Sequence, residues 1–60
     1  MKFTIKINCD NEAFGDDDSA RGDEVDRILR DLAGKVADGY LVVYLKDSNG
    51  NTVGVAAFEE

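Results

Sequence analysis

Carboxylates are the side chains of this sequence that are numerous and closely spaced enough to act together chemically. Most of them lie close together along the chain. Residues 10–26 hold eight acids and one arginine, a formal charge of −7; the whole chain carries −6, so the remaining residues sum to +1. This concentration exceeds what solubility alone requires, and it predicts a partner of opposite charge. The eight acids are Asp10, Glu12, Asp16, Asp17, Asp18, Asp23, Glu24 and Asp26.

Three kinds of chemistry suit such a cluster. Paired carboxylates can transfer protons, but so short a chain builds no deep pocket around them, and we expect no enzymatic activity. Calcium is an alternative ligand for the acids of residues 10–18, although their spacing matches no standard calcium loop, so we expect no metal and no other cofactor. The third role is electrostatic. The carboxylates would imitate the charge row of a nucleic-acid backbone and occupy the Lys/Arg groove of a nucleic-acid-binding protein. The simpler alternative is a solvated loop that only prevents aggregation.

The other reactive residue types are nearly absent. Cys9 is the only cysteine, and there is no histidine, so the chain has neither an internal disulfide nor a Cys–His pair that would activate the thiol. A lone thiol is typical of a reducing compartment, and no apolar run suggests a signal peptide or a membrane span. We therefore expect a cytoplasmic protein that, being acidic, does not bind nucleic acid directly.

The elements that position the acids follow from hydrophobic periodicity. Sixty residues make a single domain, residues 1–60. Alternating apolar residues predict strands over 2–9, 40–46 and 52–58, and an apolar stripe at helical spacing predicts a helix over 23–38. The sequence thus predicts an α+β fold of order β-α-β-β, a three-stranded sheet with one helix packed on one face, and it leaves the strand order open.

Individual residues mark the ends of these elements. Asp23 is the expected N-cap of the helix, Gly39 the residue that ends it, and Asn49-Gly50 the turn of a hairpin between the last two strands. The long connection over residues 10–22 contains Phe14, which either anchors the loop on the core or inserts into a partner.

The second face of the sheet is also apolar. Tyr40, Val42 and Tyr44 alternate with the residues expected to face the helix, and one helix cannot cover both faces. We expect this face or a free strand edge to meet another chain, most simply in a homodimer. The alternative is a small exposed patch formed by Val42, Tyr44 and Ala56.

Two stretches give the chain a family resemblance. They are N-x-D-N-x-A-F, formed by Asn8, Asp10, Asn11, Ala13 and Phe14, and D-x-N-G-N-x-V-G, formed by Asp47, Asn49, Gly50, Asn51, Val53 and Gly54. With the capped helix between them, they make nearly the whole chain resemble small β-α-β-β proteins of phages, prophages and mobile elements. Small acidic phage proteins include anti-CRISPR and anti-restriction inhibitors, several of which imitate DNA.

Together these observations lead to two hypotheses. In the first, the chain is a phage-type inhibitor that binds a basic nucleic-acid-binding site of a host defence protein through its eight acids, with Phe14 at the contact or anchoring the loop. In the second, it is a small structural or assembly module without inhibitory activity, which dimerises through Tyr40, Val42 and Tyr44.

Overall fold

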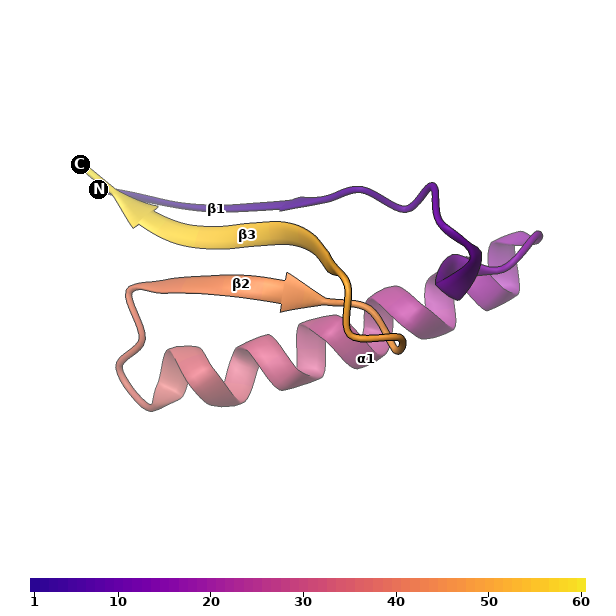
Figure 1. Ribbon diagram of the computed structural model, residues 1–60. Coiled ribbons are helices and arrows are strands. Elements are labelled where there is room, and N and C mark those ends of the chain that lie inside the picture. The colour runs from indigo at the N-terminus through magenta and orange to yellow at the C-terminus, as the bar shows by residue number, and fades with distance from the viewer.

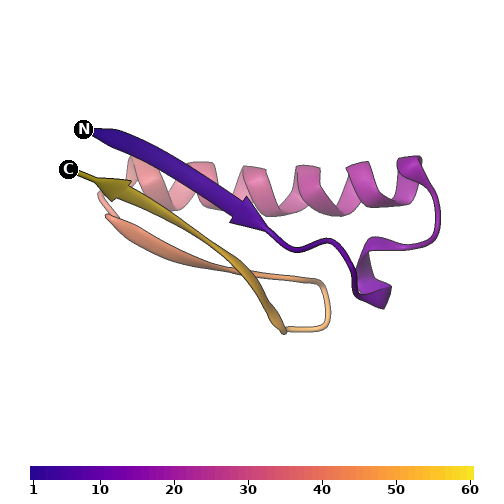
Figure 2. The same cartoon turned by 90° about the horizontal axis from the view of Figure 1, so that it is seen from above.

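The structure is a computed structural model that describes residues 1–60, and it confirms the α+β class and the β-α-β-β order (Figure 1). The elements are β1 (Lys2–Ile7), the 3-10 turn η1 (Glu12–Phe14), α1 (Asp18–Ala37), β2 (Val42–Lys46) and β3 (Thr52–Glu59). Both chain termini lie at one end of the molecule, while η1 and the start of α1 lie at the other (Figures 1 and 2).

The sheet has the order β1-β3-β2, and its central strand β3 is antiparallel to both neighbours. Ala56 of β3 is paired with Ile5 on one side and with Val43 on the other. Gly50 has a φ of 85° in the turn between β2 and β3, which confirms the predicted hairpin. The two edges of the sheet are therefore β1 and β2, which run in the same direction without touching.

The helix begins earlier than its apolar stripe predicts. Its N-cap is Asp17, whose carboxylate accepts a hydrogen bond from the Ala20 backbone N–H at 2.8 Å, so the predicted cap at Asp23 is wrong. The first turns carry no large apolar residue, and they lie beside η1 (Figure 1). The C-terminal prediction is confirmed, since Gly39 follows the last turn with a φ of 98°.

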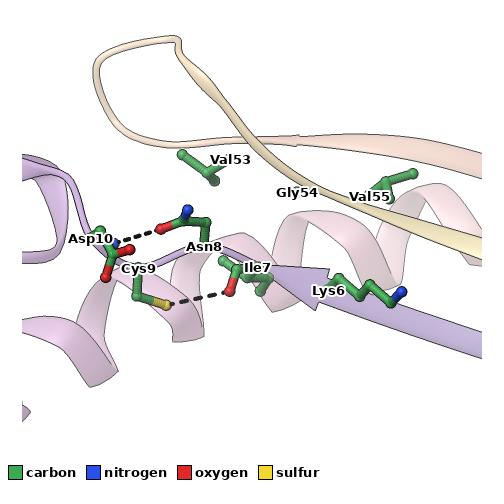
Figure 3. A pocket seen from close by; sticks show the side chains of 8 residues that line it. All are labelled: Lys6, Ile7, Asn8, Cys9, Asp10, Val53, Gly54 and Val55. Atoms are coloured by element: carbon green, nitrogen blue, oxygen red, sulfur yellow. Dashed lines mark hydrogen bonds between the residues drawn. The ribbon is translucent and has the colours of Figure 1, made fainter.

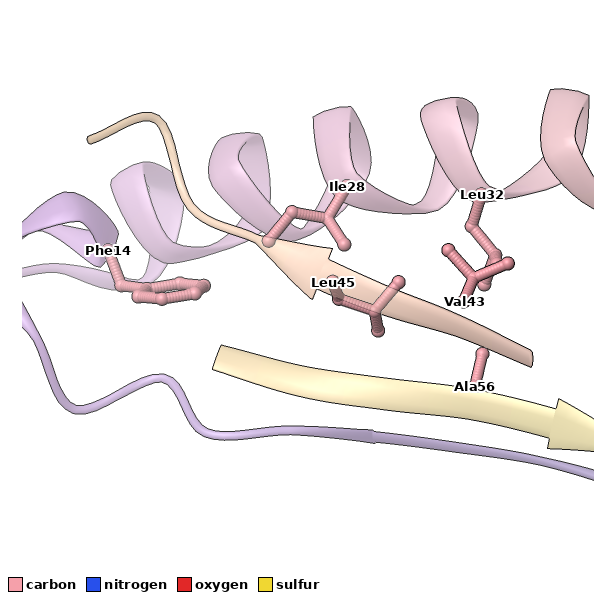
Figure 4. Close-up of a cluster of buried hydrophobic side chains, with 6 residues drawn as sticks. All are labelled: Phe14, Ile28, Leu32, Val43, Leu45 and Ala56. Carbon is pink, nitrogen blue, oxygen red and sulfur yellow. The ribbon is translucent and has the colours of Figure 1, made fainter. Parts of the chain in front are cut away.

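The core is a cluster of six buried side chains between α1 and the sheet (Figure 4). Ile28 and Leu32 of the helix meet Val43 and Leu45 of β2, and the cluster is completed by Ala56 and Phe14. Ala56 thus faces the helix, which corrects its expected place on the open face. That face is formed instead by Val55 and Ala57, the partners of Tyr44 and Val42 across the strands.

β3 approaches β1 unusually closely at Gly54, beside Lys6 and Ile7. A Cβ atom at Gly54 would collide with the Lys6 carbonyl and come within 3.0 Å of the Ile7 Cα. Glycine is required here because it alone lets the two backbones approach so closely.

Candidate functional site

Six of the exposed carboxylates lie in η1, its flanking loops and the first turns of α1, which together form one end of the molecule (Figures 1 and 2). We call this surface the acidic end. It carries six carboxylates and one arginine, Arg21, a formal charge of −5. All six side chains are exposed: Asp10, Glu12, Asp16, Asp17, Asp18 and Asp23.

The loop that carries these acids is fixed by a single aromatic side chain. Phe14 has no exposed surface and is the largest fully buried side chain of the protein. The Asn11 side chain caps η1 by accepting from the Ala13 N–H at 3.0 Å, and Gly15 turns the chain toward α1 with a φ of 69°. Phe14 therefore anchors the loop on the core. Its other predicted role, insertion into a partner, is wrong because it presents no surface.

A buried carboxylate joins the acidic end to the hairpin. Asp47 is 3% exposed and accepts hydrogen bonds from the backbone N–H groups of Asn49 and Asn51, each at 2.9 Å. The Asn11 side-chain amide donates to its other oxygen at 2.7 Å. Burial raises the pKa of Asp47, but these hydrogen bonds outweigh burial and hold it below its usual value. Asp47 is thus a structural acid that the charge pattern of the sequence did not identify.

Glu24 is the second structural acid, and its assignment to the exposed patch is wrong. Glu24 is buried, with 8% of the residue exposed. Its carboxylate accepts hydrogen bonds from the Arg27 side chain at 3.1 Å and from the Ser48 backbone N–H at 2.7 Å. The hydrogen bond from Arg27 lowers its pKa and outweighs the opposing effect of burial. Glu24 ties the middle of α1 to the hairpin and offers no charge to a partner.

The four basic residues of the helix are all matched internally. Asp18 contacts Arg21 at 2.6 Å, Asp26 contacts Arg30 at 3.0 Å, and the remaining two cations pair with Glu24 and Asp31. The charge of Asp26 is therefore balanced on the helix itself. Five acids of the acidic end have no cation within ion-pair distance: Asp10, Glu12, Asp16, Asp17 and Asp23.

The surface beside these acids is hollowed where β1 leaves the sheet (Figure 3). The hollow has a volume of about 480 Å³ and is lined by Lys6, Asn8 and Asp10 against residues 53–55 of β3. The Asp10 backbone N–H donates to the Asn8 side-chain oxygen at 2.9 Å, which fixes the turn at its rim. Because this depression is open, it could receive the end of one side chain but would not enclose a substrate.

Cys9 also lies in this hollow, and its thiol is placed for structure. The side chain is partly buried and packs against the core cluster, with its Sγ 3.9 Å from the Ile7 carbonyl oxygen. Cys9 thus faces the core as predicted, but it lies beyond β1, which ends at Ile7 and is shorter than the strand predicted over residues 2–9.

Metal binding finds no support in the geometry. No three acidic or cysteine side chains come together in a way that could hold a metal ion. No helix has the length and apolar character that crossing a bilayer would need.

Comparison with protein-family models, with curated proteins and with solved structures finds no match.

The open face of the sheet has a different character from the acidic end. Val42 and Tyr44 are exposed on it, and Tyr40 is exposed just before β2. Lys2, Lys6 and Lys46, the three lysines of the strands, lie on the same face and form no ion pair. Five acids without an ion pair thus lie at the acidic end, three more lie at the opposite end (Asp38, Glu59 and Glu60), and three lysines without an ion pair lie on the open face.

Proposed function

We propose that this chain is a small binding protein whose acidic end occupies a basic nucleic-acid-binding site on another protein. The observation that carries the proposal is the set of five exposed carboxylates, all at one end, that have no internal cation. A fixed arrangement of like charges costs folding stability through repulsion, and this cost is offset where a partner supplies cations.

The rigidity of the acidic end supports competition with nucleic acid. Phe14 holds the loop on the core, and Asn11 is tied to Asp47 at 2.7 Å, so the carboxylates are presented without a large ordering cost on binding. Their charges would displace phosphates from a lysine- and arginine-lined groove. We further propose, from the resemblance to small acidic phage proteins, that the partner is a host defence protein and that the encounter takes place in the cytosol.

Neutralising the acidic end tests this proposal. In the triple variant Asp16→Asn, Asp17→Asn, Asp18→Asn, three charges are removed and the helix keeps a cap, because asparagine caps as well as aspartate. The control removes three charges at the opposite end: Asp38→Asn, Glu59→Gln, Glu60→Gln. Both variants and the parent chain are used as bait in a host lysate at low and high salt.

We expect the parent and the control to capture a nucleic-acid-binding protein at low salt and to release it at high salt, because salt screens exposed charges. The acidic-end variant should capture much less. Equal capture by the two triple variants would show that the location of the charge is irrelevant and would refute the proposal.

A second candidate function, a dimeric assembly module, is favoured by the exposed Val42 and Tyr44. Charge weakens the simplest version, in which two open faces meet, because each face carries three lysines, Lys2, Lys6 and Lys46, and only one carboxylate of the strands, Glu59. A lysine at Val42 or Tyr44 should therefore leave the oligomeric state unchanged; dissociation of a dimer by that change would restore the open face as the interface.

A further inference from the structure

A groove on the helix side of the sheet is lined only by apolar side chains. It has a volume of about 390 Å³ and runs between Phe3 and Ile5 of β1 and Leu29, Ala33 and Ala37 of α1. The helix lies along β2, while β1 forms the far edge of the sheet, so the inner face of β1 has no helix beneath it (Figures 1 and 2). Phe3 and Ile5 are consequently 40% and 42% exposed.

The outer edge of β1 carries unpaired backbone groups beside this groove. The Asn8 N–H donates to the Val53 carbonyl at 2.8 Å, and the Lys6 carbonyl lies against Gly54, so the even-numbered residues of β1 direct their backbone groups toward β3. In an antiparallel sheet these directions alternate along the strand. The N–H and C=O groups of Phe3, Ile5 and Ile7 therefore point outward, away from the sheet.

We propose that a second copy of the chain pairs with this edge, β1 against β1 in antiparallel orientation, about a twofold axis at Ile5. Ile5 then faces Ile5 of the second copy, and Phe3 faces Ile7, so all three outward residues of each strand exchange backbone hydrogen bonds. The result is a continuous six-stranded sheet with both helices on the same side. The apolar faces of the two β1 strands meet side by side between the helices.

The positions of the lysines in β1 favour this register over the two adjacent registers. With the axis at Ile5, Lys6 faces Thr4 of the second copy and Lys2 faces Asn8. A shift that centres the pair on Thr4 would set Lys2 against Lys6, and one that centres it on Lys6 would set Lys6 against itself. Like charges placed directly opposite each other are destabilising, so only the register at Ile5 pairs the whole edge without such a conflict.

The acidic ends do not oppose this association. The acidic loop follows the C-terminal end of β1, and antiparallel pairing sends the two loops to opposite ends of the dimer. The total charge of −6 on each copy still causes weak long-range repulsion, which salt screens. Dimerisation should therefore become stronger as salt rises, whereas binding through the acidic end should become weaker.

The available apolar area sets the expected affinity. Phe3, Leu29, Ile5 and Phe58 are 36–42% exposed. At about 200 Å² for a large side chain, they leave roughly 300 Å² of apolar surface in water on each copy. A standard interface buries about 800 Å² per partner, so this one is at the small end even after the strand edge is added. We therefore expect a weak dimer that forms in the micromolar range or above.

Cysteine cross-linking tests both the edge and the register. In a Cys9→Ser background, the change Ile5→Cys places a single thiol at the twofold axis, where paired residues have Cα atoms about 5.5 Å apart, which is within the range of a disulfide. The matched control is Thr4→Cys, which the register places opposite Lys6 and too far from its own copy. Sedimentation velocity of the parent chain from micromolar to millimolar concentration, at low and high salt, gives an independent readout.

We expect the Ile5→Cys variant to form a covalent dimer under mild oxidation and the Thr4→Cys variant to remain mostly monomeric, with a parent chain that dimerises in the micromolar range. A parent chain that stays monomeric up to millimolar concentration would overturn the proposal. So would preferential cross-linking through Thr4→Cys, which would demand the register that opposes lysines. Both results are independent of whether the acidic end binds a basic partner.

Discussion

Replacing Phe14 with alanine is the sharpest test of how the acidic end is held. Phe14 belongs to a three-residue turn and to no long element, yet it is completely buried among Ile28, Leu45 and the other core residues. If this one ring fixes the loop, its removal should affect the whole fold and not only the loop.

The expected loss is large compared with the stability of so small a domain. A buried Phe→Ala change costs about 3–5 kcal/mol, including the cavity that it leaves. Stability of roughly 0.05–0.15 kcal/mol per residue gives this 60-residue chain about 3–9 kcal/mol in total. Phe14→Ala should therefore remove from about a third to all of the folding stability at 25 °C.

Urea denaturation followed by circular dichroism measures this loss, with Phe3→Ala as the matched control. Phe3 is the same residue type but 40% exposed, so its replacement should cost only about 1–2 kcal/mol. Phe14→Leu keeps most of the volume, and it gives a measurable transition if the alanine variant does not fold. A loss for Phe14→Ala no larger than for Phe3→Ala would refute the role of Phe14 as the anchor.

Three further outcomes follow from particular contacts. Gly54→Ala should lower the melting temperature because its Cβ would collide with β1. Gly34 has open space around it, so Gly34→Ala should raise the folding stability by about 0.5–1 kcal/mol. Thermal melts of both variants test these expectations. Glu24 and Asp47 have pKa values lowered from 4.5 and 3.8, so the folded state binds fewer protons than the unfolded state. The contribution of these two carboxylates to folding stability should be complete above these values and lost as pH falls through the lower folded-state pKa values. The melting temperature should therefore fall with pH in this range, and Glu24→Gln should make that fall smaller. Asp17→Ala should cost about 1 kcal/mol in urea denaturation and Asp17→Asn almost nothing, since only alanine removes the helix cap.

The sequence predicts those parts of the fold that depend on local periodicity. Ile28 and Leu32 lie on one helical stripe, Val43 and Leu45 alternate along a strand, and the structure brings all four into the core. The start of α1 could not be found in this way, because its first turns, which lie beside η1, carry no large apolar residue. Asp17 does have the residue type of an N-cap, which was the one local signal for the earlier start.

The charge pattern could not separate structural acids from exposed ones. Asn11 and Asp47 are 36 residues apart, and Glu24 is 24 residues from Ser48. Contacts of such separation depend on the strand order, which periodicity leaves open. The charge pattern alone therefore groups the eight acids of residues 10–26 into one surface, although Glu24 is buried and Asp26 forms an ion pair with Arg30.

The two stretches that carry the family resemblance have structural roles, and they contact each other. Asn11 of the first stretch donates to Asp47 of the second, Phe14 fills the core, and Gly54 permits the close contact with β1. A likeness carried by these residues is therefore a likeness of scaffold. The exposed acids that we propose for partner binding lie between the two stretches, around Asp16, and among Asp16, Asp17 and Asp18 only Asp17 also has a structural role, as the N-cap of α1. Under the proposed function, these exposed charges can therefore change, and the target with them, without disturbing the packing at Asn11, Asp47 and Gly54.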